Sequence, residues 1–169
     1  ITLFPFNNKG KKSDDFFAYC MSTDIASELG ANGKIKVSTF EELEKYLKRN
    51  FKHHTVCKKL GTRYYISGDF WKQKKHFNLS IQLFDNKKNK IIWTNSWTEK
   101  WDNFELIKNK LIDNLFRLIL GDSKKNNSNT YTQESNTQAQ ELFLKAKYLY
   151  NHRSTNQDFV NIESLLRKS

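Results

Sequence analysis

The sequence predicts an α/β fold: a mixed sheet of about five strands with helices packed on it, followed by a C-terminal helical hairpin. Three observations lead to this prediction. Residues 61–100 alternate between apolar and polar side chains in three runs, the flanking segments repeat apolar residues every three or four positions, and polar or glycine-containing breaks separate them. In chain order the predicted elements are β-α-β-α-β-β-β-α.

The alternation is clearest in the middle run of the central stretch. From Phe77 to Leu83 the odd-numbered residues are apolar and the residues between them are polar. A period of two is what a strand needs to bury one face and expose the other. Similar runs lie at 64–70 and 91–93, with polar breaks between them. We therefore expect an antiparallel three-stranded meander.

The N-terminal part predicts a short strand and a long helix. Residues 1–6 are apolar and include the only proline of the chain, Pro5, which fits a buried strand that turns out of the sheet. A helix is expected from residue 13 onward, because apolar residues recur every fourth position and Gly30 or Gly33 can end it. The residues of that stripe are Phe17, Met21, Ile25 and Leu29.

The next segment predicts a second strand and two short helices. Residues 34–38 alternate as a short strand would. Thr39 and Glu42 have the spacing of a capping box, which begins a helix by satisfying free backbone amides. A further turn or two of helix is expected around 54–60, ending at Gly61.

The C-terminal third divides at a polar stretch. A wide apolar stripe from Phe104 to Ile119 predicts a long helix that lies across the sheet and ends at Gly121. Residues 122–137 are rich in Ser, Asn, Thr, Lys and Gln, which predicts a linker. Two helices follow, so we expect an α/β domain at 1–121, a linker at 122–137, and at 138–169 a helical hairpin that begins a repeat array.

Charge and cysteine content limit the classes of function that the sequence suggests, but they do not identify one. The 169 residues carry 29 basic and 18 acidic side chains, a formal charge of +11. Such a charge suits an acidic partner, but lysines scattered over every face of a protein with a biased composition are the simpler explanation. Cys20 and Cys57 are expected to be buried thiols in different helices. The chain starts within a strand-like run, so we expect it to be part of a longer protein.

No reactive centre is predicted. His53, His54 and Cys57 lack a third and fourth partner for a metal ion, and the loop after the first strand has a single glycine, Gly10, where a phosphate-binding loop needs more. We therefore predict no catalytic residues, no metal and no cofactor. The tryptophans allow two interpretations: they cover the sheet and its final helix, or they form an exposed patch for a partner protein. They are Trp71, Trp93, Trp97 and Trp101.

Taken in order, the sequence resembles the TolB-like amino-terminal domain, a module of bacterial adenylate and guanylate cyclase-type signalling proteins. The similar stretches are Ile-Thr-Leu-Phe-Pro-Phe-Asn at 1–7, Ser-Thr-Asp-Ile at 22–25, Leu-Gly-Thr-Arg-Tyr-Tyr-Ile-Ser-Gly at 60–68, Ile-Gln-Leu-Phe-Asp at 81–85 and Ile-Trp at 92–93. The resemblance covers residues 1–121, and the segment from Gln138 looks like the start of tetratricopeptide repeats. It implies an anticodon-binding-like fold and an upstream cyclase or DNA-binding domain.

These observations lead to one hypothesis and two alternatives. We expect a non-catalytic interaction or sensory module of a larger bacterial signalling protein, which acts by protein–protein binding. The first alternative is a nucleic-acid-binding domain that uses the basic surface. The second is an enzyme with a dispersed site. Whether the protein lies in the cytoplasm or the periplasm depends on what precedes residue 1. No small-molecule substrate and no membrane segment is predicted within the chain.

Overall fold

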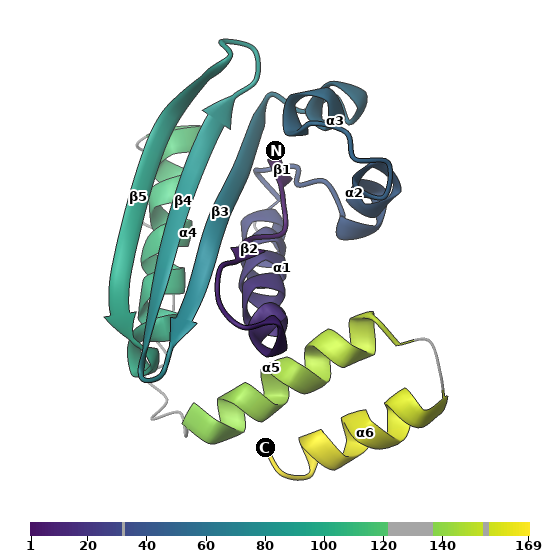
Figure 1. Cartoon of the computed structure of the whole chain (residues 1–169). Coiled ribbons are helices and arrows are strands. Elements are labelled where there is room, and N and C mark those ends of the chain that lie inside the picture. Colours follow the sequence, from purple (N-terminus) through teal and green to yellow (C-terminus); the bar gives the residue numbers. More distant parts are fainter. Residues whose placement is uncertain (32, 122–136, 154–155) are drawn as a thin grey trace.

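The fold centres on a five-stranded mixed sheet. The computed structural model describes residues 1–31, 33–121, 137–153 and 156–169. Strands β3 (Tyr64–Gln73), β4 (His76–Asp85) and β5 (Lys90–Lys100) form the antiparallel meander, as predicted. Their order in the sheet is β1-β3-β4-β5, so β5 lies at one edge (Figure 1).

The alternation of the sequence becomes two different faces of the sheet. Ile66 of β3 is paired with Leu83 of β4, which is paired with Trp93 of β5, so these side chains share one face. On β4 the odd-numbered residues of that face are buried, whereas the even-numbered residues are half-buried or exposed. The meander therefore has one face in the core and one polar face, as the period of two requires.

Two very short strands complete the sheet. Strands β1 (Thr2–Leu3) and β2 (Asn7–Asn8) pair in parallel with β3, with Pro5 between them. The predicted strand at 34–38 is wrong: this segment forms no strand. Its backbone bonds to Ile1, whose amino group donates to the Lys36 carbonyl at 2.7 Å and whose carbonyl accepts from Ser38 at 2.9 Å. Hydrogen bonds to a single residue are too few to pair two strands, and β2 supplies the fifth strand of the sheet instead.

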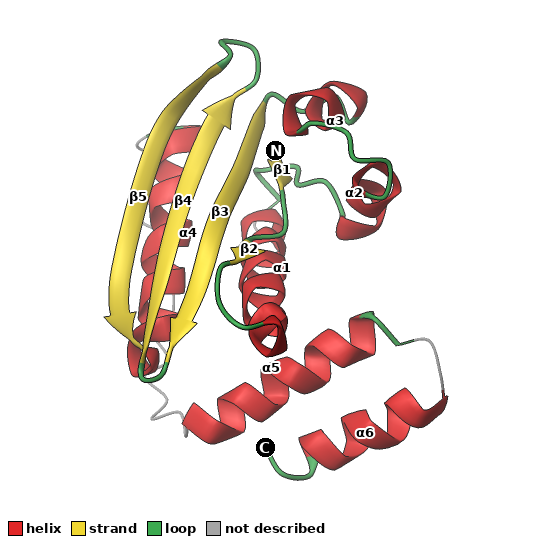
Figure 2. Ribbon diagram, in the orientation of Figure 1, coloured by secondary structure: helices red, strands yellow, loops and turns green. Residues whose placement is uncertain are grey.

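Helices α1 (Asp15–Ala31) and α4 (Phe104–Leu120) cover the apolar face of the sheet (Figure 2). Both contribute to the main core, with Phe17 and Leu29 from α1 and Leu111 from α4 fully buried. Lys108 of α4 ties the two helices together, because its Nζ lies 3.0 Å from Glu28 of α1 and 2.7 Å from Glu105 of α4. Helix α4 ends at Gly121, whose positive φ of 78° suits glycine, as predicted.

Helices α2 (Phe40–Leu47) and α3 (His53–Lys59) enclose a second, smaller core beside β1. The Thr39–Glu42 capping box is confirmed, with both reciprocal hydrogen bonds present. Phe4 enters this small core and its ring stacks on His53 at a centroid distance of 3.9 Å. Phe4 therefore joins the N-terminal segment to these two helices.

Helices α5 (Thr137–Asn151) and α6 (Asn156–Leu166) form the expected hairpin, and α5 packs on α1. Leu144 of α5 belongs to the main core and its carbonyl accepts a hydrogen bond from the Cys20 thiol at 3.3 Å. Lys147 pairs with Asp24 of α1. Residues 122–136 of the predicted linker at 122–137 lie outside the described residues. The hairpin after the linker shares the core of the α/β domain.

Asp85, at the end of β4, gives a testable pH dependence. Its side chain is 2% exposed, Arg63 donates to its Oδ2 at 2.9 Å, and the backbone amides of Lys87 and Lys88 donate to its Oδ1. Hydrogen bonding from Arg63 and these amides holds the pKa of Asp85 below its ordinary value of 3.8. A carboxyl with a lowered pKa stabilises the fold above its unfolded-state pKa, and this contribution is lost as the pH falls through the folded-state value.

We therefore expect Asp85→Asn to be less stable than the wild type at neutral pH, and the difference in unfolding free energy to shrink below pH 3.8. Urea unfolding of both proteins at a series of pH values measures that difference. Other carboxyl groups titrate equally in the two proteins, so they cancel in the comparison. A difference that stays constant from neutral pH into the acid range would contradict the assigned role of the Asp85 charge.

Candidate partner-binding surface

The structure places the four tryptophans in three different environments. Trp93 and Trp97 lie on the helix-facing side of β5, half-buried against the core, with ring centroids 6.3 Å apart. Trp101 is 3% exposed, and Trp71, on the opposite face of the sheet, is 44% exposed. The four side chains that the sequence grouped together therefore do not form one continuous patch.

Trp101 is a core residue. It begins the 3-10 turn Trp101–Asn103 before α4, and its backbone amide donates to the Lys75 carbonyl in the β3–β4 turn. Its ring packs within 4.4 Å of Phe17 and 5.0 Å of Phe104, measured between centroids. For this residue the first interpretation of the sequence holds: it covers the end of the sheet and the start of the final helix.

Trp93 and Trp97 belong to the edge strand. β5 is an 11-residue strand at the end of the sheet order, and within the described ranges no strand pairs with its outer edge. Charged residues stand only near its two ends, at Lys90, Glu99 and Lys100. Proteins usually protect an edge with charges, proline or a very short strand, because unpaired backbone groups attract further strands. The middle of β5 has none of these protections.

The start of β5 also exposes apolar side chains. Ile91 and Ile92 are exposed, next to the irregularity where the β4–β5 register shifts between Leu83 and Phe84. With the half-buried rings of Trp93 and Trp97, they make β5 an apolar edge strand. Alternation in the sequence identified this strand, but its edge position depends on the sheet order, which the sequence does not reveal.

Cys20 and His53, which the sequence did not favour as catalytic or metal-binding residues, are packed against other side chains. Burial, together with the nearby Asp24 carboxylate, raises the pKa of the Cys20 thiol to about 12, so this thiol is protonated at neutral pH. Burial also lowers the pKa of His53, whose ring stacks on Phe4. Among the residues whose positions are described, no group of three or more His, Cys, Asp and Glu side chains could hold a metal ion. In the same part of the chain, none of the helices has the length and hydrophobicity of a membrane-spanning segment.

Comparison with known proteins gives similarity of fold. No family model and no curated protein matches the chain. TolB from Acinetobacter baumannii matches with a TM-score of 0.52 at 14% identity, over 71% of this chain and 28% of that chain. Lipoprotein GNA1162 from Neisseria meningitidis matches with a TM-score of 0.51 at 14% identity, over 73% of this chain and 97% of that chain.

A third solved structure, the LpoB C-terminal domain from Salmonella enterica, matches with a TM-score of 0.47 at 14% identity, over 59% of this chain and 80% of that chain. The first two matches show a TolB-like fold, a mixed α/β sheet with helices packed on it. This confirms the fold that the sequence predicted. A shared fold at such low identity does not carry function with it.

Proposed function

We propose that this chain is a non-catalytic protein-binding module that adds an extended segment of a partner protein to the edge of β5. The observation that carries the proposal is the long edge strand itself, which is uncharged along its middle and carries two half-buried tryptophans. A segment that pairs with such an edge gains main-chain hydrogen bonds along its length. Trp93 and Trp97 would then become fully buried anchors of the interface.

The tryptophans also explain how such an edge would select its partner. Main-chain pairing is insensitive to sequence, whereas pockets beside alternate side chains give specificity. Trp93 and Trp97 are four residues apart on one face, with Asn95 between them. Large aromatic side chains contribute most of the binding energy in many interfaces. A partner strand with small apolar residues at alternate positions would fit beside them.

We propose a wider context for this module. The hairpin at 138–169 would begin a tetratricopeptide-like array in a larger bacterial signalling protein, with any cyclase or DNA-binding activity in a separate upstream domain. Exposed apolar residues on the hairpin support the idea that further helices pack on it. They are Phe143, Tyr150, Phe159, Val160 and Leu166.

The β5 proposal predicts a specific cross-linking pattern in cells that express the chain. A photoreactive benzoylphenylalanine at Thr94 in the middle of β5 should cross-link to a partner protein, whereas the same group at Lys48, an exposed residue directly after α2, should not. Trp97→Ala should weaken the Thr94 cross-link by about tenfold or more, as expected for an interface anchor.

Asn95→Lys provides the second variant for this experiment. A lysine on an edge strand blocks the addition of another strand, while its long side chain can still reach solvent. We expect it to abolish the cross-link at Thr94 and to leave the circular dichroism spectrum unchanged. Equal cross-linking from positions 94 and 48, or a Thr94 product that survives both substitutions, would show that β5 is not the binding edge.

A further inference from the structure

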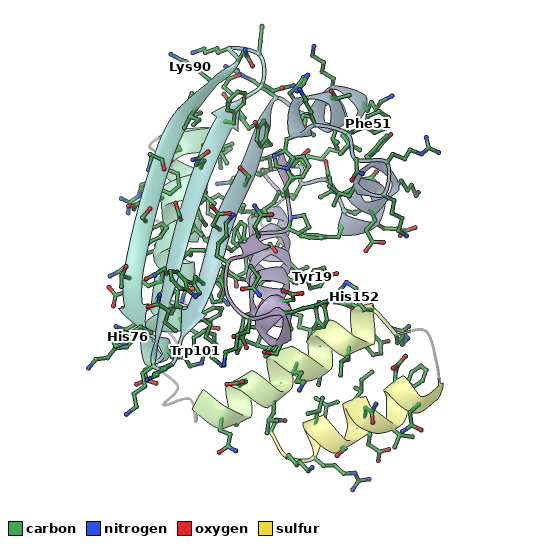
Figure 3. The ribbon with its side chains drawn as sticks, in the orientation of Figure 1. Tyr19, Phe51, His76, Lys90, Trp101 and His152 are labelled. Carbon is green, nitrogen blue, oxygen red and sulfur yellow. The ribbon has the colours of Figure 1, made fainter. Side chains whose placement is uncertain are left out.

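A basic cavity lies at the end of the sheet where β3 turns into β4. It has a volume of about 780 Å³ and is lined by residues from two stretches of the chain: Lys11, Ser13, Asp14, Trp71, Lys72, Gln73, Lys74 and His76. Figure 3 shows His76 and Trp101 at this end of the sheet. A neighbouring cavity of about 450 Å³ shares Lys72, Lys74 and His76 and adds Lys75, Lys100 and Glu141.

The charge of this region is predominantly positive. Among the described residues, five lysines and His76 line the two cavities, against the three carboxylates of Asp14, Asp102 and Glu141. Three of these lysines, Lys72, Lys74 and Lys75, lie together at the β3–β4 turn, whereas Lys11 and Lys100 come from distant segments, so the sequence shows only part of the cluster. Folding brings the loop before α1, the β3–β4 turn and the end of β5 to one place.

Trp71 supplies an exposed apolar surface at the mouth of the larger cavity. Its ring lies against the loop before α1 at Gly10, where an added Cβ would be 3.1 Å from the Trp71 Cδ1. Glycine at this position therefore leaves room for the indole to approach the loop closely. The tryptophan is held in place and still accessible, which suits an aromatic anchor for a ligand.

Lys72 already binds a carboxylate here. Its Nζ lies 2.8 Å from Oε2 of Glu141, which reaches the site from α5. The Lys72 side chain is 15% exposed, and its ammonium lies over the Phe17 ring at 4.2 Å. A largely desolvated lysine held over an aromatic ring makes a strong ion pair with a carboxylate. Glu141 thus shows that a carboxylate can bind at this site.

We propose that this basic cavity binds an acidic peptide segment of a partner protein, with its carboxylates on Lys72, Lys74 and Lys75 and an apolar side chain on Trp71. The shape favours a peptide over a lipid surface, because the site is a cavity and a membrane presents a plane. Its composition favours a peptide over nucleic acid. Among the described residues the lining holds no arginine, and Trp71 is its one exposed indole because Trp101 is buried in the core, so there is no row of indoles on which successive bases could stack. This site does not depend on the β5 edge.

The test uses the whole chain and a fluorescein-labelled hexaglutamate peptide, with binding measured by anisotropy. Lys74→Glu/Lys75→Glu should weaken binding by about tenfold or more, the effect of ~1.4 kcal/mol. The matched control is Lys87→Glu/Lys88→Glu in the β4–β5 turn, which makes the same charge change at the other end of the sheet. The control should weaken binding by no more than about twofold, because salt screens charges at that distance.

Glu141→Gln provides a readout that a purely structural role would not produce. Removing this internal carboxylate frees Lys72, so we expect the peptide to bind more tightly than to the wild type. Trp71→Ala should weaken the binding of a hexaglutamate peptide extended by one leucine, and should have little effect on hexaglutamate itself.

Three results would overturn the proposal. One is an equal loss of affinity in the two lysine variants, which would mean that only net charge matters. Another is Glu141→Gln that binds the peptide no better than the wild type. The third is a competing ligand that binds through Lys74 and Lys75 more tightly than hexaglutamate does. If that ligand is an oligothymidine of the same charge, the site is a nucleic-acid surface. If it is a phosphatidylcholine vesicle containing phosphatidylglycerol, the site is a membrane surface.

Discussion

Gly68→Ala is expected to lower the free energy of unfolding by about 3 kcal/mol, the upper end of the range for overpacking a core. Gly68 lies in the middle of β3, opposite Ile81 of β4. A Cβ at this position would be 2.6 Å from the backbone oxygen of Ser80 and 3.3 Å from the Phe6 ring. The oxygen belongs to the central ladder of the sheet, so it cannot move without disturbing the pairing.

Thermal and urea unfolding of this variant measure the effect, with a decrease in melting temperature of about 10 °C for a chain of this size. Gly30→Ala is the matched control. Gly30 lies in α1, and an added Cβ would make an ordinary contact with Val37 at 3.8 Å. This control should gain up to about 1 kcal/mol of stability from improved helix propensity. If Gly68→Ala were as stable as the wild type, this result would contradict the close approach of β3 and β4 at Gly68.

Glu28→Gln/Glu105→Gln is expected to cost about 3 kcal/mol of stability, because it leaves the ammonium of Lys108 without a carboxylate in a largely buried position. The Lys108 side chain is 10% exposed. Burial alone lowers the pKa of this lysine, but contacts with Glu105 and Glu28 outweigh burial, so its pKa lies above the ordinary value of 10.5. The two carboxylates therefore make it favourable to keep the charge between α1 and α4.

Lys108→Met is the control for this prediction. It removes the buried charge, keeps most of the side-chain volume, and leaves both glutamates able to reach water, so it should cost less than about 1.5 kcal/mol. Urea unfolding compares the three proteins. A raised lysine pKa stabilises the fold below its unfolded-state value, so the loss in the double variant should shrink as the pH rises above 10.5. A larger loss in Lys108→Met than in the double variant would refute this account.

The elements that the sequence predicted well carry their own local signal. The β4 alternation from Phe77 to Leu83 and the Thr39–Glu42 capping box depend on neighbours within a few residues, and both are present in the structure. Strands β1 and β2 have two residues each and exist only because β3 lies beside them. Residues 34–38 alternate in sequence, yet they pair with no strand in the described part of the chain and form a loop.

The site was harder to predict than the fold for a similar reason. Trp71, Trp93 and Trp97 look alike in the sequence, but the register of the strands places Trp71 on the opposite face from the other two. The basic cavity depends on contacts between residues far apart, such as Lys72 and Glu141, and these follow from the packing of α5 on α1. Such contacts leave no pattern within a short window of sequence.

The packing of α5 on α1 sets a practical limit on how this protein can be divided for study. Figure 3 shows Tyr19 of α1 and His152, the residue after α5, facing each other, with ring centroids 4.5 Å apart. A truncation at Gly121, where composition alone suggests a boundary, would uncover the Cys20 thiol and remove the counter-charge of Asp24. A fragment designed for expression should therefore retain helix α5.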